Sequence, residues 1–114
     1  MIRGKVVLLP FPFDDLATTK VRPAVCLTEP IGPHRHVVVA FITSQLPTPA
    51  LESDLVLDIG TTDFAATGLR VSSTLRLHRL MTVTTGVIQR ELGLLSPSLL
   101  TEVGVKLKKL FQLT

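Results

Sequence analysis

The sequence predicts a small, mainly β domain, a strongly curved antiparallel barrel that ends in one α-helix. Short segments rich in β-branched and leucine residues fill the first two-thirds of the 114 residues, and turns with proline, glycine or aspartate separate them. Near the C-terminus the spacing of apolar residues changes to three or four, as in a helix. The length suffices for one hydrophobic core but not for two, so we expect one domain over residues 1–114.

Several segments have the composition of strands. The segment 36–43 is continuously apolar, which is typical of a strand buried on both faces. The most regular alternation runs over 70–78. It predicts a polar face made of Arg70, Ser72, Thr74, Arg76 and His78. It predicts an opposite face made of Val71, Ser73, Leu75 and Leu77. The other expected strands are 5–9, 21–28, 55–59 and 81–84.

Two helical segments are expected at the C-terminal end. Residues 85–92 predict a short helix that stops at Gly93. A longer helix follows Ser96, which is placed to cap it, with Pro97 at its first position. Its expected apolar face is made of Leu99, Leu100, Val103, Leu107, Leu110 and Phe111. Gly104 inside this helix costs about 1 kcal/mol relative to alanine, so tertiary packing must hold the helix.

Charge and cysteine content limit the class of protein. Twelve basic and nine acidic residues give a net charge of +3, which permits a polyanionic partner without requiring one. The single cysteine, Cys26, excludes an internal disulfide and is expected to be a buried, inert thiol. No apolar run approaches the roughly 20 residues needed to span a bilayer, and no secretory leader precedes the first strand. We therefore expect a cytoplasmic protein without a membrane partner.

One arginine lies beside a proline on an otherwise apolar strand. A guanidinium buried in such a place needs an anion, so Arg22 before Pro23 indicates a position for a phosphate. The alternative is that Arg22 extends past the proline bend into solvent. The acidic pair Asp14 and Asp15 in the preceding turn could supply a base, but an Asx-type turn is the commoner role of such residues.

Three blocks of the chain match, in order, the signatures of one protein family. The first block contains Arg3-Gly4, Val6-Val7-Leu8, Phe11-Pro12-Phe13, Asp15-Leu16 and Lys20-Val21-Arg22-Pro23-Ala24-Val25. The second is Phe41-Ile42-Thr43-Ser44-Gln45, and the third is Thr67-Gly68-Leu69 with Ser73 and Arg76. Together the blocks cover most of the chain, which therefore resembles the MazF/PemK family of bacterial toxins.

This resemblance implies an SH3-like barrel with a terminal helix, the fold of MazF, PemK and CcdB toxins, paired as a homodimer. It implies a toxin of a toxin–antitoxin pair that arrests growth by cutting single-stranded RNA, mainly mRNA, at preferred sequences. It implies no metal and no other cofactor. A small acidic antitoxin would neutralise the toxin through a disordered tail that folds on binding. The family's catalytic arginine maps onto Arg22, and its catalytic threonine or serine onto Thr43.

The two mapped residue types suit this chemistry. In such cleavage the substrate's own 2′-OH is the nucleophile, and the products carry a 2′,3′-cyclic phosphate and a 5′-OH. A guanidinium fits the charge that builds on the phosphoryl oxygens, and the hydroxyl of Thr43 can donate to one of them. Because the pKa of arginine is above about 12, Arg22 is expected to act first as an electrostatic stabiliser.

Six further residues are candidate RNA contacts: Lys20, Ser44, Gln45, Phe13, Ser73 and Arg76. Lys20 and Arg76 would contact phosphates. The chain has no tryptophan or tyrosine, so Phe11 or Phe13 would be the residue that stacks on a base, and the other is expected in the core. Two alternatives stay open: a toxin of the same fold that binds a protein such as gyrase, as CcdB does, and an RNA-binding barrel without catalysis.

Overall fold

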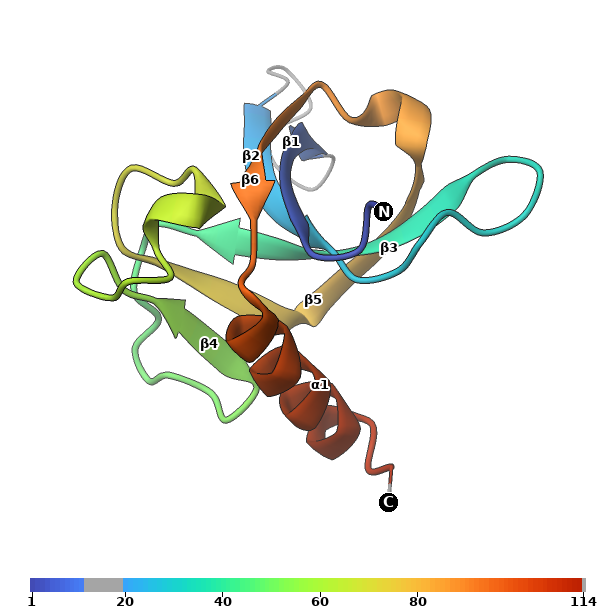
Figure 1. Cartoon of the computed structure of the whole chain (residues 1–114). Helices are drawn as coiled ribbons and strands as arrows, with labels where there is room; N and C mark the ends of the chain where they lie inside the picture. The colour runs from blue at the N-terminus through green and yellow to red at the C-terminus, as the bar shows by residue number, and fades with distance from the viewer. Residues whose placement is uncertain (12–19, 114) are drawn as a thin grey trace.

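The computed structural model describes residues 1–11 and 20–113. Within these residues, six strands form one antiparallel sheet in the order β4-β5-β3-β2-β1-β6. The strands are β1 (Lys5–Phe11), β2 (Lys20–Cys26), β3 (His36–Thr43), β4 (Asp54–Leu57), β5 (Ser73–Thr84) and β6 (Arg90–Leu94). The sheet curls into a half-barrel, and helix α1 (Pro97–Leu110) follows β6 (Figure 1). The predicted mainly β fold with a C-terminal helix is confirmed.

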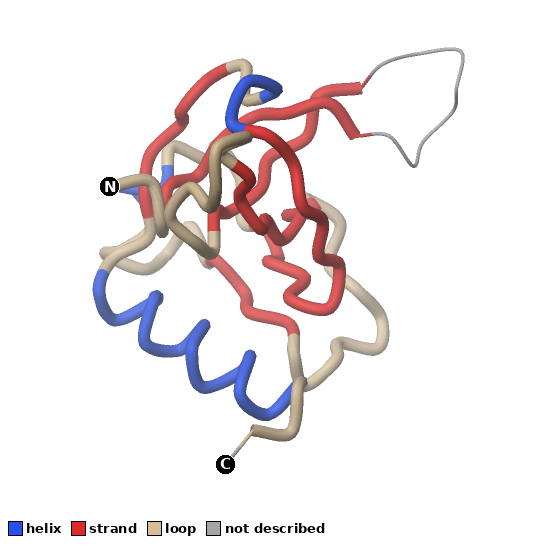
Figure 2. The backbone as a smooth tube through the Cα atoms, turned by 90° about the vertical axis from the view of Figure 1, so that its right-hand side faces the viewer, coloured by secondary structure: helices blue, strands red, loops and turns tan. Residues whose placement is uncertain are grey.

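Both faces of the sheet are buried, which explains the continuous apolar run of β3. Ala40 and Ile42 belong to one hydrophobic cluster, whereas their neighbours Val39 and Phe41 belong to another on the opposite face. Helix α1 closes the first cluster and lies along one side of the sheet (Figure 2). Met81 and Val83, in the second half of β5, pack against the second cluster. Within the described residues, the curled sheet therefore buries this cluster against itself, without a second layer of helices or strands.

Helix α1 begins as its sequence predicts. The Ser96 hydroxyl accepts a hydrogen bond from the backbone N–H of Leu99 at 3.2 Å, and Pro97 occupies the first turn. The helix packs on the first cluster through Leu99, Leu100, Val103 and Leu107. The prediction that Phe111 belongs to this apolar face is wrong, because Phe111 follows the helix and is 55% exposed.

The prediction of a helix over residues 85–92 is wrong. These residues form a short 3₁₀ turn, η2 (Thr85–Val87), and then enter β6. Strand β6 pairs antiparallel with β1, from Lys5 opposite Leu94 to Leu8 opposite Arg90. This pairing satisfies a row of backbone groups along β1 that would otherwise be left without partners, so tertiary pairing outweighs the weak local helix preference.

The strands predicted over 70–78 and 81–84 are two halves of β5, joined by a bulge. Phe41 of β3 pairs with Arg76, but the preceding residue, Ala40, pairs with Leu80. Residues 77–79 are therefore three extra residues on β5 between two neighbouring positions of β3. Bulges bend the strand that carries them and change the direction of its side chains.

The polar face predicted for 70–78 is correct only in part. Strand β5 begins at Ser73, so Arg70 and Ser72 lie before it. Thr74, expected on the polar face, is completely buried, and its neighbours Ser73 and Leu75 on the opposite face are buried as well. Both faces of the first part of β5 are therefore covered, and the polar alternation of the sequence does not correspond to an exposed face there.

Two glycines allow a close contact between backbones. The 3₁₀ turn η1 (Ala65–Thr67) ends at Gly68, whose φ of 74° lies in the left-handed region that favours glycine. A Cβ atom at Gly68 would overlap the carbonyl of Leu92 in β6, and one at Gly93 would overlap the carbonyl of Ala66. The turn therefore rests directly on β6, and neither position has room for a side chain.

Cys26 is buried, as the sequence predicts. Burial raises the pKa of its thiol to about 11, so almost no thiolate exists at neutral pH and the side chain is a poor nucleophile. Over residues 1–11 and 20–113, no helix is both long enough and apolar enough to cross a membrane.

Candidate functional site

A pocket opens where β2 and β3 diverge. In the described chain, these strands pair only from Cys26 opposite Val39 to Ala24 opposite Phe41. The pairing stops beside Pro23, which has no backbone N–H to donate. Beyond this point β2 stays with β1, while β3 follows β5 as far as its last residue. A cavity of about 190 Å³ lies at this divergence.

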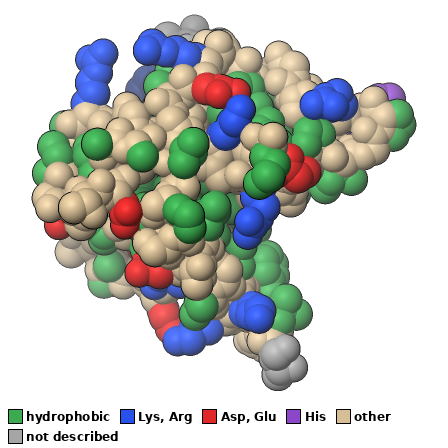
Figure 3. All heavy atoms as spheres, in the orientation of Figure 1, with side chains coloured by type: hydrophobic (Ala, Val, Ile, Leu, Met, Phe, Trp, Pro, Cys, Tyr) green, Lys and Arg blue, Asp and Glu red, His purple; other side chains and the backbone are tan. Residues whose placement is uncertain are grey.

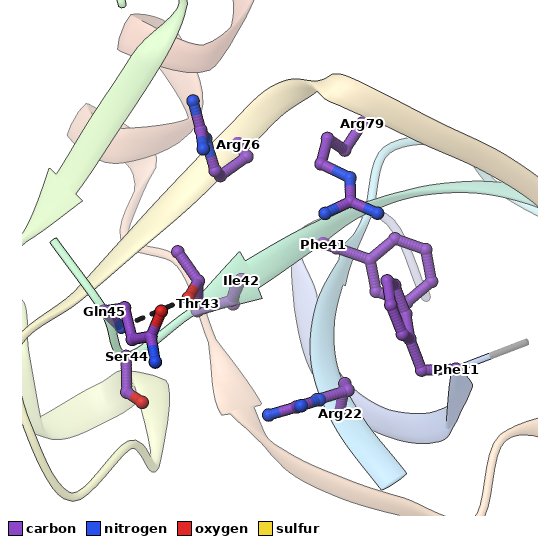
Figure 4. A pocket seen from close by; sticks show the side chains of 9 residues that line it. All are labelled: Phe11, Arg22, Phe41, Ile42, Thr43, Ser44, Gln45, Arg76 and Arg79. Carbon is purple, nitrogen blue, oxygen red and sulfur yellow. Dashed lines mark hydrogen bonds between the residues drawn. The ribbon is translucent and has the colours of Figure 1, made fainter. Parts of the chain in front are cut away.

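Four strands and the turn after β3 contribute side chains to this cavity (Figure 4). The lining residues are Phe11, Arg22, Phe41, Ile42, Thr43, Ser44, Gln45, Arg76 and Arg79. Five of the eight predicted site residues are among them: Arg22, Thr43, Ser44, Gln45 and Arg76. We call this cavity the Arg22 pocket.

Arg22 enters the pocket from the first half of β2. It lies opposite Leu9 of β1, in the part of β2 that has left β3. Its guanidinium points toward the end of β3, where Thr43 and Ser44 lie (Figure 4). Arg22 is exposed, so the argument that a buried guanidinium at this position needs an anion does not apply. Its place in the pocket, facing a hydroxyl on another strand, is the stronger indication of a phosphate site.

Thr43 holds its hydroxyl in a defined direction at the end of β3. Its Oγ1 accepts a hydrogen bond from the backbone N–H of Gln45 at 3.1 Å, drawn as the dashed line in Figure 4. This is a local turn in which the threonine oxygen is the acceptor. A hydroxyl that accepts here still has its own proton to donate, and a phosphoryl oxygen in the pocket can accept it.

Arg76 is largely committed to a neighbour in the sheet. Its Nε and one terminal nitrogen lie 3.0 and 3.4 Å from the two carboxylate oxygens of Asp54, directly opposite on β4. The Asp54 side chain is 2% exposed and also accepts the N–H of Leu51. The predicted phosphate contact of Arg76 is therefore limited to the N–H groups that Asp54 leaves. Asp54 lies outside the strand predicted over 55–59, so the sequence does not indicate it as a partner of Arg76.

Arg79 also lines the pocket, although the sequence does not predict it, because the bulge in β5 changes the direction of its side chain. Its guanidinium carbon lies 5.2 Å from the centre of the Phe11 ring. That ring in turn packs edge-to-face against Phe41, with centroids 4.5 Å apart and planes at 82°. The only available signal was a second basic residue three positions after Arg76, which regular alternation would place on the other face.

The sequence as a whole matches one protein family. The model of PemK-like and MazF-like toxins of type II toxin–antitoxin systems matches residues 2–111. The chain belongs to this toxin family. A comparison with curated proteins finds no match. The membership rests on nearly the whole chain, including the Arg22 pocket and the terminal helix.

Solved structures of similar shape are toxins of the same kind. The Mycobacterium tuberculosis toxin MazF-mt6 has a TM-score of 0.74 at 20% identity, over 96% of this chain and 98% of that chain. An endoribonuclease from Mycobacterial species, solved with its cognate antitoxin, has a TM-score of 0.70 at 16% identity, over 100% and 97% of the two chains. A chain of the MazE–MazF structure from Deinococcus radiodurans has a TM-score of 0.67 at 17% identity, over 100% and 98%. These likenesses confirm the predicted MazF/PemK-type fold.

The other three predicted RNA contacts of this toxin are not among the residues that line the Arg22 pocket. Lys20 is exposed at the start of β2 and lies beyond the pocket lining. Ser73 is 3% exposed, and its hydroxyl donates to the carbonyl of Val71 at 2.9 Å, so its position does not support an RNA contact. Phe13, like Asp14 and Asp15, lies outside the described residues.

Charges are distributed evenly on the face of the toxin shown in Figure 3. Basic, acidic and hydrophobic side chains alternate there, without one dominant basic patch. The arginines of the Arg22 pocket therefore make a better argument for an anionic substrate than the net charge does.

Among the residues that the structure describes, no three His, Cys, Asp or Glu side chains lie together as metal ligands would.

Proposed function

We propose that this toxin is an endoribonuclease that cuts single-stranded RNA at a preferred sequence, with Arg22 and Thr43 as its catalytic residues. One observation carries the proposal. The two positions that match the family's catalytic residues lie on different strands, β2 and β3, and both line one pocket. Membership of the toxin family supports it, and two solved mycobacterial structures of this fold are of an endoribonuclease, one of them with its cognate antitoxin.

The proposed reaction needs charge stabilisation more than a protein nucleophile. The 2′-OH of the RNA gives its proton to water and attacks the adjacent phosphorus, while the bond from phosphorus to the 5′-oxygen breaks and that oxygen takes a proton from water. Charge builds on the non-bridging phosphoryl oxygens during this exchange. The Arg22 guanidinium can donate two parallel hydrogen bonds to these oxygens, and the Thr43 hydroxyl can donate a third. Because Arg22 and Thr43 can supply this stabilisation, we propose that cutting proceeds in EDTA.

We also propose that the toxin forms a homodimer and is neutralised by a small acidic antitoxin. The mycobacterial endoribonuclease was solved with its cognate antitoxin, and the Deinococcus structure contains MazE with MazF. The net charge of +3 suits an acidic partner. Charge complementarity of this kind favours rapid and selective association.

Replacing Thr43 by valine tests the proposal, because valine keeps the branched shape and removes the hydroxyl. We expect kcat/KM for cleavage of a single-stranded RNA to fall about 10²- to 10³-fold, as when one preorganised donor is removed. The matched control is Thr43→Ser, which keeps the hydroxyl and is expected to retain most of the activity. The exposed N–H of Gln45 can bond to water, so the fold should survive.

Two results would count against the proposal. A Thr43→Val variant that cuts at the parental rate would show that the Thr43 hydroxyl has no part in the mechanism. A parent protein that arrests growth while leaving cellular RNA intact would favour a toxin that binds a protein target.

A further inference from the structure

Arg79 reaches the Arg22 pocket only because β5 contains a bulge. In a regular strand, residues three apart point to opposite faces, so Arg76 and Arg79 would not share a pocket. The extra residues 77–79 remove this restriction, and both arginines line the cavity. Bulges are over-represented beside active sites, where they redirect a side chain.

The guanidinium of Arg79 is oriented by aromatic rings and leaves its donors available. It lies over the ring of Phe11 at 5.2 Å, and Figure 4 shows it pointing toward the Phe11–Phe41 pair. Within the part of the chain that the structure describes, the Arg79 side chain makes no hydrogen bond or ion pair, in contrast to Arg76 with its Asp54 partner. Its N–H groups are therefore available to a ligand.

The surroundings of Arg79 suit a base better than a second phosphate. Arg22 and Thr43 lie at the part of the pocket that we assign to the scissile phosphate, whereas Arg79 lies beside Phe11 and Phe41. Aromatic rings offer a phosphate neither a positive charge nor a strong hydrogen-bond donor, but a ring such as that of the half-buried Phe11 provides stacking or edge contacts for a base. A base next to the scissile phosphate would extend from Arg22 toward this aromatic wall.

We propose that Arg79 is a specificity-determining residue that selects guanine or cytosine at a nucleotide next to the scissile phosphate. The inference rests on the proposed function and names part of its substrate. A guanidinium presents two parallel N–H groups, which fit two adjacent acceptors. Guanine offers O6 and N7 on its Hoogsteen edge, and cytosine in single-stranded RNA offers O2 and N3 on its Watson–Crick edge. Adenine and uracil place a donor beside the acceptor on the corresponding edges, so neither completes the pair.

The test compares the parent with Arg79→Ala and Arg79→Lys. Cleavage sites are mapped by sequencing the products of a randomised RNA. Binding is measured by fluorescence anisotropy with four oligonucleotides that differ in one base and carry a 2′-deoxy nucleotide at the cut site. The parent should prefer guanine or cytosine at one flanking position by about 10-fold or more. Both variants should lose this preference and still cut, because Arg22 and Thr43 remain. Lysine should keep more overall affinity than alanine, since it keeps the charge.

The matched control is Arg70→Ala, which removes an exposed arginine outside the pocket and should leave the preference unchanged. The inference is overturned if Arg79→Ala keeps the parental preference, or if the parent shows no preference for guanine or cytosine. It is also overturned if Arg79→Ala weakens the binding of all four oligonucleotides equally and makes the slope of log affinity against log salt concentration smaller by about one, as the loss of one phosphate contact would. A parent that cuts RNA in any of these cases leaves the proposed function standing, whereas a parent that neither cuts nor binds RNA overturns both.

Discussion

Arg22→Ala is expected to lower kcat/KM for cleavage of single-stranded RNA by at least about 10²- to 10³-fold. Removing one neutral donor from a preorganised anion site has an effect of this size, and Arg22 also carries a positive charge. Arg22 is an exposed residue that belongs to neither hydrophobic cluster, so the loss should not come from unfolding. Initial rates on a fluorogenic RNA, together with thermal unfolding of each variant, measure both effects.

Two further variants show whether the effect depends on the geometry and the position of the charge. Arg22→Lys keeps the charge but not the two parallel donors, so its activity should lie between those of the parent and the alanine variant. Arg90→Ala removes an exposed arginine from β6, outside the pocket, and should cut at the parental rate. An Arg22→Ala protein that is folded and cuts as fast as the parent would show that the pocket is not the catalytic site.

Gly93→Ala is expected to lower the free energy of unfolding by at least about 2 kcal/mol, a large part of the total for a small domain. The added methyl group would overlap the backbone of Ala66 and Thr67, which cannot rotate away as a side chain can. Relief requires η1 to move off β6, which pairs with β1. Gly68→Ala should have a comparable effect, because its left-handed φ adds to the overlap.

Gly104→Ala is the matched control for these glycine variants. Gly104 lies in α1, and no atom outside the local helix backbone comes within 4 Å of the position that an added methyl group would occupy. Alanine should therefore stabilise the protein by up to about 1 kcal/mol. Urea unfolding followed by circular dichroism measures all three variants. Equal midpoints for Gly93→Ala and the parent would contradict the backbone contact between η1 and β6.

The fold is largely predictable because its signals are local. The β-branched run of β3 and the Ser96 cap before α1 each act within a few residues, and both predictions are confirmed. The helix predicted over 85–92 failed because β6 is defined by its partner, β1, which lies some 85 residues earlier in the sequence. Local preference carries no information about such a pairing.

The same distinction applies to the Arg22 pocket. Arg22 and Thr43 were found through family signatures, and the structure places both at one cavity. Asp54 and Arg79 were missed because their roles depend on register. Asp54 becomes the partner of Arg76 only when β4 pairs with β5, and Arg79 enters the pocket only through the bulge. Alternation alone cannot reveal either contact.

Product end-group analysis tests the central claim most directly. A single-stranded RNA is cut in EDTA, and the ends are identified by mass spectrometry, beside the same RNA with a 2′-deoxy nucleotide at the cut site. We expect 2′,3′-cyclic phosphate and 5′-OH ends from the RNA, and no cutting at the deoxy position. Products with 5′-phosphate ends, or equal cutting of the deoxy substrate, would show that the 2′-OH is not the nucleophile and would contradict the role assigned to Arg22 and Thr43.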